Sequence, residues 1–428
     1  MSGTALLATT IVLRGATLID GTGAAPVPDS LLVVSDGRVA YAGAATKDAL
    51  ASVPAGSASV AVRGLWIVPG LIDAHVHAES DADLRTILRW GVTSVRLMSE
   101  DVAASERLSR DSRVRADIPR VFPAAPIFTA KGGWWDQGEP PDANLNRFPS
   151  TPAEARLSVR KARALGAREI KLMLDDMAWC RAPRPALPKM SSEVAAALLS
   201  EAAAQGVRAI VHAPELADAK AAVSYGATAL AHGVLEPIDE ETVGVMRRRP
   251  VFYVPTMDVF EFLADTRRFV DSVLSDPAVS GPGGLPGATV ARYRDAAYAS
   301  GYRARYPAFE NVMRRLPALR ENLRRLHGSG VPVALGTDMW AFPGLGVSIE
   351  MVLFVEAGLS PLEALRAATQ TAARSIGIEA DAGTLERGKG GDFLLLSDDP
   401  VREVRNVRRI VAVYKNGVEV SRAGGAAR

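Results

Sequence analysis

The sequence has almost no cysteine, few histidines, no long apolar run and no excess of one charge. Cys180 is the only cysteine among 428 residues, so an intrachain disulfide is excluded and we expect a packed thiol rather than a nucleophile. No run of about 20 apolar residues occurs, so no membrane-spanning helix is expected. The 50 basic residues nearly balance the 48 acidic ones, which argues against a nucleic-acid-binding surface.

The apolar stretch 5–13 near the N-terminus has no basic leader, and no small-residue cleavage site follows it. We therefore interpret it as a strand rather than a signal peptide. Together with the single cysteine, this interpretation predicts a cytoplasmic protein.

Four of the five histidines stand at the ends of apolar, strand-like runs. These residues are His75, His77, His212 and His232, and a later run ends in the same way in the carboxylate of Asp338. Imidazole and carboxylate groups are the ligands that hold a borderline metal such as zinc. Their placement therefore predicts a metal-dependent hydrolase.

The spacing of His75 and His77 supports a shared ion. Side chains two positions apart in a strand point to the same face, whereas on a helix they diverge. A single His-x-His pair also occurs on solvated strand ends, so the prediction depends on the other strand-end residues.

Strands alternate with helical segments through the middle of the chain. The candidate strands span residues 67–75, 92–98, 120–125, 169–174, 208–213, 228–232, 251–257 and 331–337. This alternation predicts an α/β fold with a parallel sheet, and eight strands predict a (β/α)8 TIM barrel. An open doubly wound sheet has the same alternation but would not bring strands one and eight together. Active sites of such barrels lie at the carboxyl ends of the strands, where the four histidines and Asp338 fall.

Both ends of the chain are rich in short strands instead. The turn pairs Asp36-Gly37 and Asn416-Gly417 indicate hairpins. We predict a small β-sandwich domain built from residues 1–64 and 385–428, with the barrel over residues 65–384. A long interval at 258–328 separates strands seven and eight, and both a lid and a solvated helical insertion fit it.

Lys171 lies inside the apolar strand 169–174. A charged lysine is rarely buried without a partner, so its amine either reaches water or changes its charge. Lys171 could act as a metal ligand only if its amine lost its positive charge, because an ammonium group has no lone pair.

The combined pattern resembles the amidohydrolase superfamily, in particular its imidazolonepropionase-like and prolidase-like branch. The segments that carry the resemblance are residues 69–77, Lys171, His212, His232, 336–338, 355–369 and 383–393. The resemblance covers essentially the whole chain apart from 258–328.

This resemblance implies a binuclear metal centre. His75, His77 and Asp338 would hold one ion, and His212 and His232 the other. Lys171 would be carboxylated by carbon dioxide, and the resulting carbamate would bridge the two ions. Zinc is the expected metal, while manganese, cobalt and iron suit the same donors. An unmodified Lys171 would favour one ion.

The resemblance also implies the chemistry of the site. Two cations lower the pKa of a shared water, and the resulting hydroxide attacks a polarised carbonyl group. Asp338 would accept the proton of the water and return it to the leaving group. Asp338 could equally be a ligand only, or cap the chain that follows it.

Two departures from the branch concern the substrate pocket. Trp134 follows Gly132-Gly133, at a position where members of this branch often have a histidine. Ser348 occupies another position where a histidine is common in the branch. The candidate pocket residues are Trp134, Trp135, Glu215, Tyr253 and Ser348. Each has an ordinary structural alternative: loop packing for the tryptophans, a helix-start carboxylate for Glu215 and strand packing for Tyr253.

We expect a hydrolase that cleaves an amide-type C–N bond of a small molecule, such as an N-acyl amino acid, a dipeptide or an aromatic amide. The first alternative is a lactone, carbamate or organophosphate ester hydrolase. A cyclic-amidine hydrolase or deaminase and a non-catalytic scaffold are less favoured. The expected partner is the small-molecule substrate, with no nucleic acid or membrane. The resemblance also allows a homo-oligomer.

Overall fold

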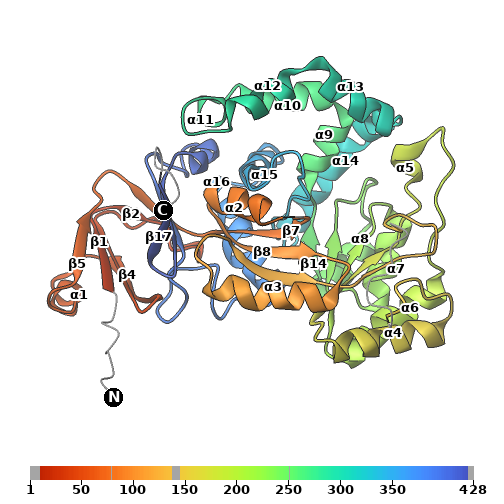
Figure 1. Cartoon of the computed structure of the whole chain (residues 1–428), viewed down its shortest axis with the longest axis horizontal. Coiled ribbons are helices and arrows are strands. Elements are labelled where there is room, and N and C mark those ends of the chain that lie inside the picture. The colour runs from red at the N-terminus through yellow and green to blue at the C-terminus, as the bar shows by residue number, and fades with distance from the viewer. Residues whose placement is uncertain (1–9, 79, 137–144, 250, 423–428) are drawn as a thin grey trace.

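Strands from the two ends of the chain and parallel strands from its middle form separate sheets (Figure 1). The computed structural model describes residues 10–78, 80–136, 145–249 and 251–422. Its architecture is a TIM-barrel-like α/β fold, accompanied by one sheet of N-terminal strands and a second sheet that combines N-terminal with C-terminal strands.

The terminal sheets share one apolar core. The first has the order β4-β3-β1-β5, from β1 (Thr10–Arg14), β3 (Ser30–Ser35), β4 (Arg38–Ala44) and β5 (Ala58–Ala61). The second has the order β17-β16-β15-β6-β2, from β2 (Thr17–Leu18), β6 (Trp66–Pro69), β15 (Phe393–Leu396), β16 (Ile410–Lys415) and β17 (Val418–Arg422). Leu13, Leu32, Ile67, Phe393 and Ala412 belong to their common cluster.

The hairpin signals at the termini are confirmed. Asp36 and Asn416 each have a φ of 51°, the left-handed conformation that Asp-Gly and Asn-Gly turns require. The strand expected within 5–13 is present as β1 from Thr10 onward, while residues 5–9 lie outside the described part of the chain.

The middle of the chain supplies two groups of parallel strands. One has the order β7-β8-β9, from β7 (Leu71–Val76), β8 (Val92–Met98) and β9 (Arg120–Ala124). The other has the order β10-β11-β12-β13-β14, from β10 (Ile127–Phe128), β11 (Glu169–Met173), β12 (Arg208–His212), β13 (Ala229–Ala231) and β14 (Phe252–Val254). The N–H of Ala125 donates to Glu169 O at 2.9 Å, which links the two groups.

The predicted eighth strand at 331–337 forms a short bridge rather than a regular ladder. Val333 pairs in parallel with Tyr253 of β14, and the N–H of Ala334 donates to Tyr253 O at 2.9 Å. On the other side, the N–H of Ala74 in β7 donates to Leu335 O at 3.0 Å. The segment therefore lies between β14 and β7.

The predicted strand 67–75 is two strands in different sheets. β6 pairs with β15 in a terminal sheet, whereas β7 pairs with β8, and Gly70 separates them. The continuous run of strand-forming residues concealed this break. A side chain at Gly70 would meet Thr93, because an added Cβ would lie 2.2 Å from Thr93 Oγ1.

Helices connect the parallel strands and cover them. They are α2 (Asp81–Arg89), α3 (Val102–Val114), α4 (Pro152–Ala164), α5 (Ala178–Arg181), α6 (Ser192–Ala204), α7 (Leu216–Tyr225), α8 (Glu240–Arg248), α15 (Leu345–Glu356), α16 (Pro361–Arg366) and α17 (Ala372–Ile376). A π-helical turn (Ala367–Thr371) joins α16 to α17, a 3-10 helix (Val404–Arg408) precedes β16, and α1 (Lys47–Ala51) lies among the N-terminal strands.

The 258–328 interval is helical. It contains most of α9 (Met257–Ala264), then α10 (Thr266–Leu274), α11 (Pro277–Ser280), α12 (Gly287–Arg294), α13 (Ala296–Arg305) and α14 (Phe309–Gly328). In Figure 1, α10 to α13 arch over one side of the molecule. Across the described residues, no helix combines the length and the apolar character that crossing a membrane demands.

Candidate metal centre

The carboxyl ends of the parallel strands gather the predicted ligands at one edge of the sheet. His75 is the penultimate residue of β7, and His212 is the last residue of β12. His77 directly follows β7, and His232 directly follows β13. Asp338 ends the segment that lies between β14 and β7, and its N–H donates to His75 O at 2.7 Å.

Asp338 lies at the centre of this group. Its Oδ1 is 3.8 Å from His75 Nε2 and 3.4 Å from His77 Nε2, and its Oδ2 is 4.0 Å from His232 Nδ1. The ring centroids of His75 and His232 are 4.7 Å apart, and those of His212 and His232 are 4.3 Å apart. One potential ligand atom each from His75, His232 and Asp338 lies within 4.8 Å of the other two.

Buried polar atoms without partners show that these residues fit a metal. Neither ring nitrogen of His75, whose side chain is 0% exposed, has a hydrogen-bond partner among the described residues. The same holds for Nζ of Lys171, which is 2% exposed. A buried polar group left unpaired costs about 1–3 kcal/mol, so such groups are expected to have a function. Imidazoles, a carboxylate and an amine open to carboxylation are a suitable donor set for divalent ions.

The electrostatics of the cluster favour uncharged donors. Burial, with a smaller contribution from the Lys171 charge, holds the pKa of His75 well below its ordinary value. Burial, followed by the neighbouring His212, does the same to the pKa of His232. Both imidazoles are therefore neutral and keep a lone pair. Burial lowers the pKa of Lys171 to about 7, although Asp338 opposes the shift. A neutral amine is thus available near neutral pH, and this is the form that reacts with carbon dioxide.

The backbone bends sharply where the strands end. His232, Asp338 and Thr256 have φ values of 68°, 55° and 45°, in the left-handed region that non-glycine residues rarely adopt. Such strained conformations concentrate at functional sites, where the surrounding structure maintains them.

Buried hydrogen bonds fix the ends of β7 and of the 333–338 segment relative to each other. The side chain of Asp73, which is fully buried, accepts from Thr337 Oγ1 at 2.7 Å and from the N–H groups of Thr337 and His75 at 3.0 Å. This carboxylate thereby connects the backbone of His75 with Thr337, the residue before Asp338.

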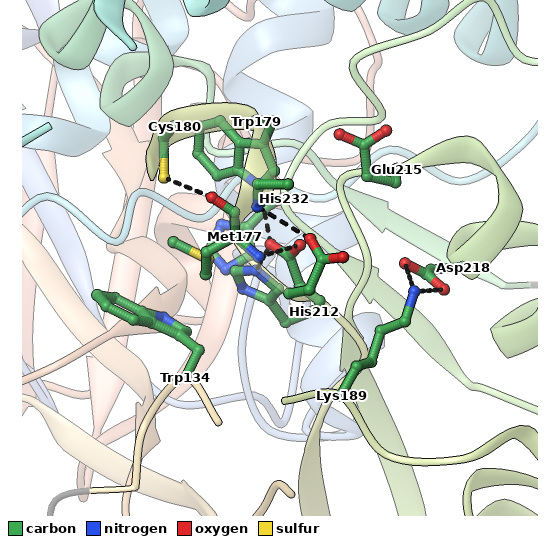
Figure 2. A network of polar contacts seen from close by, with 12 residues as sticks. Trp134, Met177, Trp179, Cys180, Lys189, His212, Glu215, Asp218 and His232 are labelled. Carbon is green, nitrogen blue, oxygen red and sulfur yellow. Dashed lines mark hydrogen bonds and ion pairs between the residues drawn. The ribbon is translucent and has the colours of Figure 1, made fainter. Parts of the chain in front are cut away.

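Two histidines are held by one ring nitrogen each. His232 Nδ1 is 2.9 Å from Thr256 Oγ1. His212 Nε2 is 2.9 Å from Oδ2 of Asp175, a buried residue in the loop after β11 (Figure 2). The two rings therefore meet the cluster in defined orientations.

A cavity of about 690 Å³ opens above the cluster. Its lining includes all six predicted ligands and an aromatic wall of Trp134, Trp135, Trp179, Phe260, Tyr302, Tyr306 and Trp340. Helices α9 and α13 of the 258–328 interval thus contribute to the wall. A larger cavity of about 1060 Å³ lies at the amino ends of the strands and contains none of the predicted ligands.

The predicted pocket residues divide into two groups. Trp134 and Trp135 line the cavity, and the Trp135 ring lies 4.6 Å from that of His77. Glu215, Tyr253 and Ser348 are not among the residues that line it. Their polar groups have other partners: Glu215 pairs with Arg315, the Tyr253 hydroxyl accepts from the N–H of Val234, and the Ser348 hydroxyl accepts from Arg408 Nε. Cys180 is a packed thiol, as expected, and burial raises its pKa to about 12.

The sequence reasoning missed several residues around the site. Asp175, Thr256 and Arg305 were not among the predicted site residues. Asp175 directly follows the predicted strand 169–174 and Thr256 lies near the end of the predicted strand 251–257, so the strand-end rule that found the histidines could have found them. Arg305 belongs to the long insertion, where no sequence pattern indicates which side chains face the cavity.

Comparisons with known proteins agree with this geometry. The sequence profile of the amidohydrolase family matches residues 66–420. The ochratoxinase of Aspergillus niger is 25% identical over 381 residues, which cover 86% of this chain and 69% of that protein.

Solved structures share the fold over nearly the whole chain. A putative prolidase from Bifidobacterium longum superposes with a TM-score of 0.73 at 25% identity, covering 98% of this chain and 96% of the other. A Xaa-Pro dipeptidase with methionine bound in its active site gives a TM-score of 0.74 at 21% identity, covering 96% and 99%.

Proposed function

Because the chain belongs to the amidohydrolase family, we propose that it is a metal-dependent hydrolase that cleaves an amide-type C–N bond of a small molecule. The observation that carries this proposal is the strand-end cluster, in which buried nitrogens of His75 and Lys171 have no partner among the described residues.

We assign the metal-binding roles as follows. His75, His77 and Asp338 would hold one divalent ion, His212 and His232 would hold a second, and Lys171, once carboxylated, would be a ligand shared by both. When bound, the two ions, with zinc the first choice, lower the pKa of a water and polarise the scissile carbonyl group. The lowered pKa of Lys171 supports the carbamate, because it makes the neutral amine accessible.

Asp338 is the proton carrier in this scheme. Its carboxylate lies within 4.0 Å of three histidines, and its side chain is 17% exposed toward the cavity. Burial raises its pKa to about 7, while the charge of Lys171 opposes the shift. A carboxyl group with a pKa near the working pH can accept a proton from water and return it to the leaving nitrogen.

The cavity supports a flat, apolar substrate of moderate size. Its volume is in the range that accommodates small-molecule ligands, and its wall is aromatic. Arg305 adds a cation to the lining, and its guanidinium lies over the Tyr306 ring, 5.5 Å from the ring centroid. The lining acids Asp83 and Asp136 do have partners, in Ser80 and Lys131. An N-acyl amino acid, a dipeptide or an aromatic amide fits these features, with its carboxylate near Arg305 where it has one.

Three structural features belong to the same proposal. The 333–338 segment closes the barrel between β14 and β7, the two terminal sheets form a separate sandwich domain, and the helices after α9 act as a lid. The contacts of Val333, Ala334 and Ala74 support the first of these. The common core of the terminal sheets supports the second. The cavity-lining residues from α9 and α13 support the third.

The test is hydrolysis by protein stripped with a chelator and then reloaded with zinc or manganese. The substrates are N-benzoyl-L-phenylalanine, prolyl dipeptides and anilides on one side, and phenyl acetate, a γ-lactone and a phosphotriester on the other. We expect amide cleavage that requires metal and is lost in Asp338→Asn. Cleavage of the esters alone would move the assignment to an ester hydrolase. No turnover in any class with fully loaded protein would contradict the proposal.

A further inference from the structure

The loop after β11 places a carboxylate behind one of the histidines. Asp175 is fully buried and lies four positions after Lys171. Its Oδ2 accepts from the indole Nε1 of Trp179 at 2.8 Å and lies 2.9 Å from His212 Nε2. Its Oδ1 accepts from the N–H of Met177 at 2.8 Å. Figure 2 labels Met177, Trp179 and His212, the three residues that contact the Asp175 carboxylate.

The partners of Asp175 determine which nitrogen of His212 carries the proton. An indole N–H and a backbone N–H can only donate, so both carboxylate oxygens act as acceptors. An ionised carboxylate has no proton to give, and therefore His212 Nε2 must donate to it. The neutral imidazole then has its lone pair on Nδ1, the nitrogen available to a metal.

The second histidine of the same pair contacts a hydroxyl group rather than a carboxylate. His232 Nδ1 lies 2.9 Å from the hydroxyl of Thr256 and 4.0 Å from Asp338 Oδ2. A hydroxyl group accepts or donates, so it holds His232 without imposing one protonation state. The carboxylate behind His212 imposes one, and it also increases the basicity of the ring.

We propose that Asp175 is a positioning residue that holds His212 with Nδ1 toward the second metal ion and sets the affinity of that ion. This inference rests on the proposed metal centre. The conformation of the loop allows these contacts. Met177 has a φ of 58°, and the turn at this residue brings the Trp179 indole within hydrogen-bond distance of the Asp175 carboxylate. Trp179 also lines the cavity, so the wall of the pocket and the support of the ligand belong to one loop.

The alternative role for Asp175 is a turn-forming residue. Its bond to the N–H of Met177 is an ordinary Asx-turn contact, which an exposed aspartate can also make. The next residue shows this case, because Asp176 Oδ1 accepts from the N–H of Ala178 at 2.9 Å and contacts no histidine. Asp176 is therefore the matched control, since it makes the turn contact without the contact to a ligand.

The first readout is metal affinity, measured by titrating zinc into metal-free protein against a chromophoric chelator. We expect two binding steps in wild type and in Asp176→Asn. In Asp175→Asn, one step should weaken by about 10–100-fold while the other is unchanged. Trp179→Phe, which removes one donor to the carboxylate, should weaken the same step by less, and it replaces Asp175→Asn if that variant does not fold.

The second readout is the tautomer of His212 in the metal-free protein. Only five histidines are present, so nitrogen NMR of the imidazole side chains can resolve them. We expect His212 to be protonated on Nε2 in wild type and to lose this preference in Asp175→Asn. A wild-type His212 protonated on Nδ1 would overturn the inference, as would two unchanged zinc affinities in Asp175→Asn. A wild type that binds no metal would instead contradict the proposed function itself.

Discussion

Glu350 replaces the missing cap of a helix that builds the pocket. Helix α9 follows Thr256, whose side chain makes no capping bond. Instead Glu350, in α15, accepts from the N–H of Met257 and from the N–H of Asp258, each at 2.8 Å. Glu350, Met257 and Asp258 are all fully buried, so these two amide groups are shielded from bulk water. Because Thr256 contacts His232, the same carboxylate stabilises one predicted ligand indirectly.

Glu350→Ala leaves two buried amide groups without an acceptor. Each costs about 1–3 kcal/mol, so the free energy of unfolding should fall by about 2–6 kcal/mol. Glu356→Ala is the control on the same helix. Its side chain is 48% exposed and lies 3.6 Å from Arg405, so a loss of at most about 1 kcal/mol is expected.

The assay is urea denaturation followed by far-ultraviolet circular dichroism, with the zinc content measured in parallel. The account predicts a much lower midpoint for Glu350→Ala than for Glu356→Ala, and reduced metal retention. Equal midpoints for the two variants would refute the role of Glu350 as the cap of α9.

Three further predictions concern pH, packing and specificity. Burial raises the pKa of Glu350 to about 8 and raises that of Asp258, so the folded state retains protons that the unfolded chain releases above about 4.5. Relative to Glu350→Gln, the thermal midpoint of wild type should therefore fall between pH 5 and 8, and an unchanged difference between the two proteins across this range would contradict the prediction. Gly70→Ala should cost about 1–3 kcal/mol by overpacking against Thr93, and added Thr93→Ala should restore part of it in thermal melts. Arg305→Gln should raise KM for N-benzoyl-L-phenylalanine but not for N-benzoylphenethylamine, which lacks the carboxylate; equal changes would exclude a carboxylate contact.

The local rules of strand geometry were sufficient to predict from the sequence that four histidines lie close to Asp338. His75, His77, His212 and His232 all end apolar runs, and parallel strands of a barrel end on one face. The structure places them together with Asp338, as the pattern predicts. The fold class follows from the same alternation of strands and helices.

Features that depend on distant contacts could not be predicted in this way. The break at Gly70 occurs because β6 and β7 join different sheets, although strand-forming residues continue through it. Tyr253 lies within the predicted strand 251–257, and its hydroxyl accepts from the N–H of Val234, a contact that depends on the packing of the loop after β13. The capping of α9 by Glu350 joins residues more than 90 positions apart, so no local pattern contains it.

The metal content of wild type and of Lys171→Ala, purified without chelators, tests the central claim most directly. Plasma mass spectrometry should find about two divalent ions per chain in wild type and fewer in the variant, because the bridging carbamate is lost. One ion in both proteins would contradict the bridged pair. No metal in wild type, even after reconstitution with zinc or manganese and carbon dioxide, would contradict the metal centre as a whole.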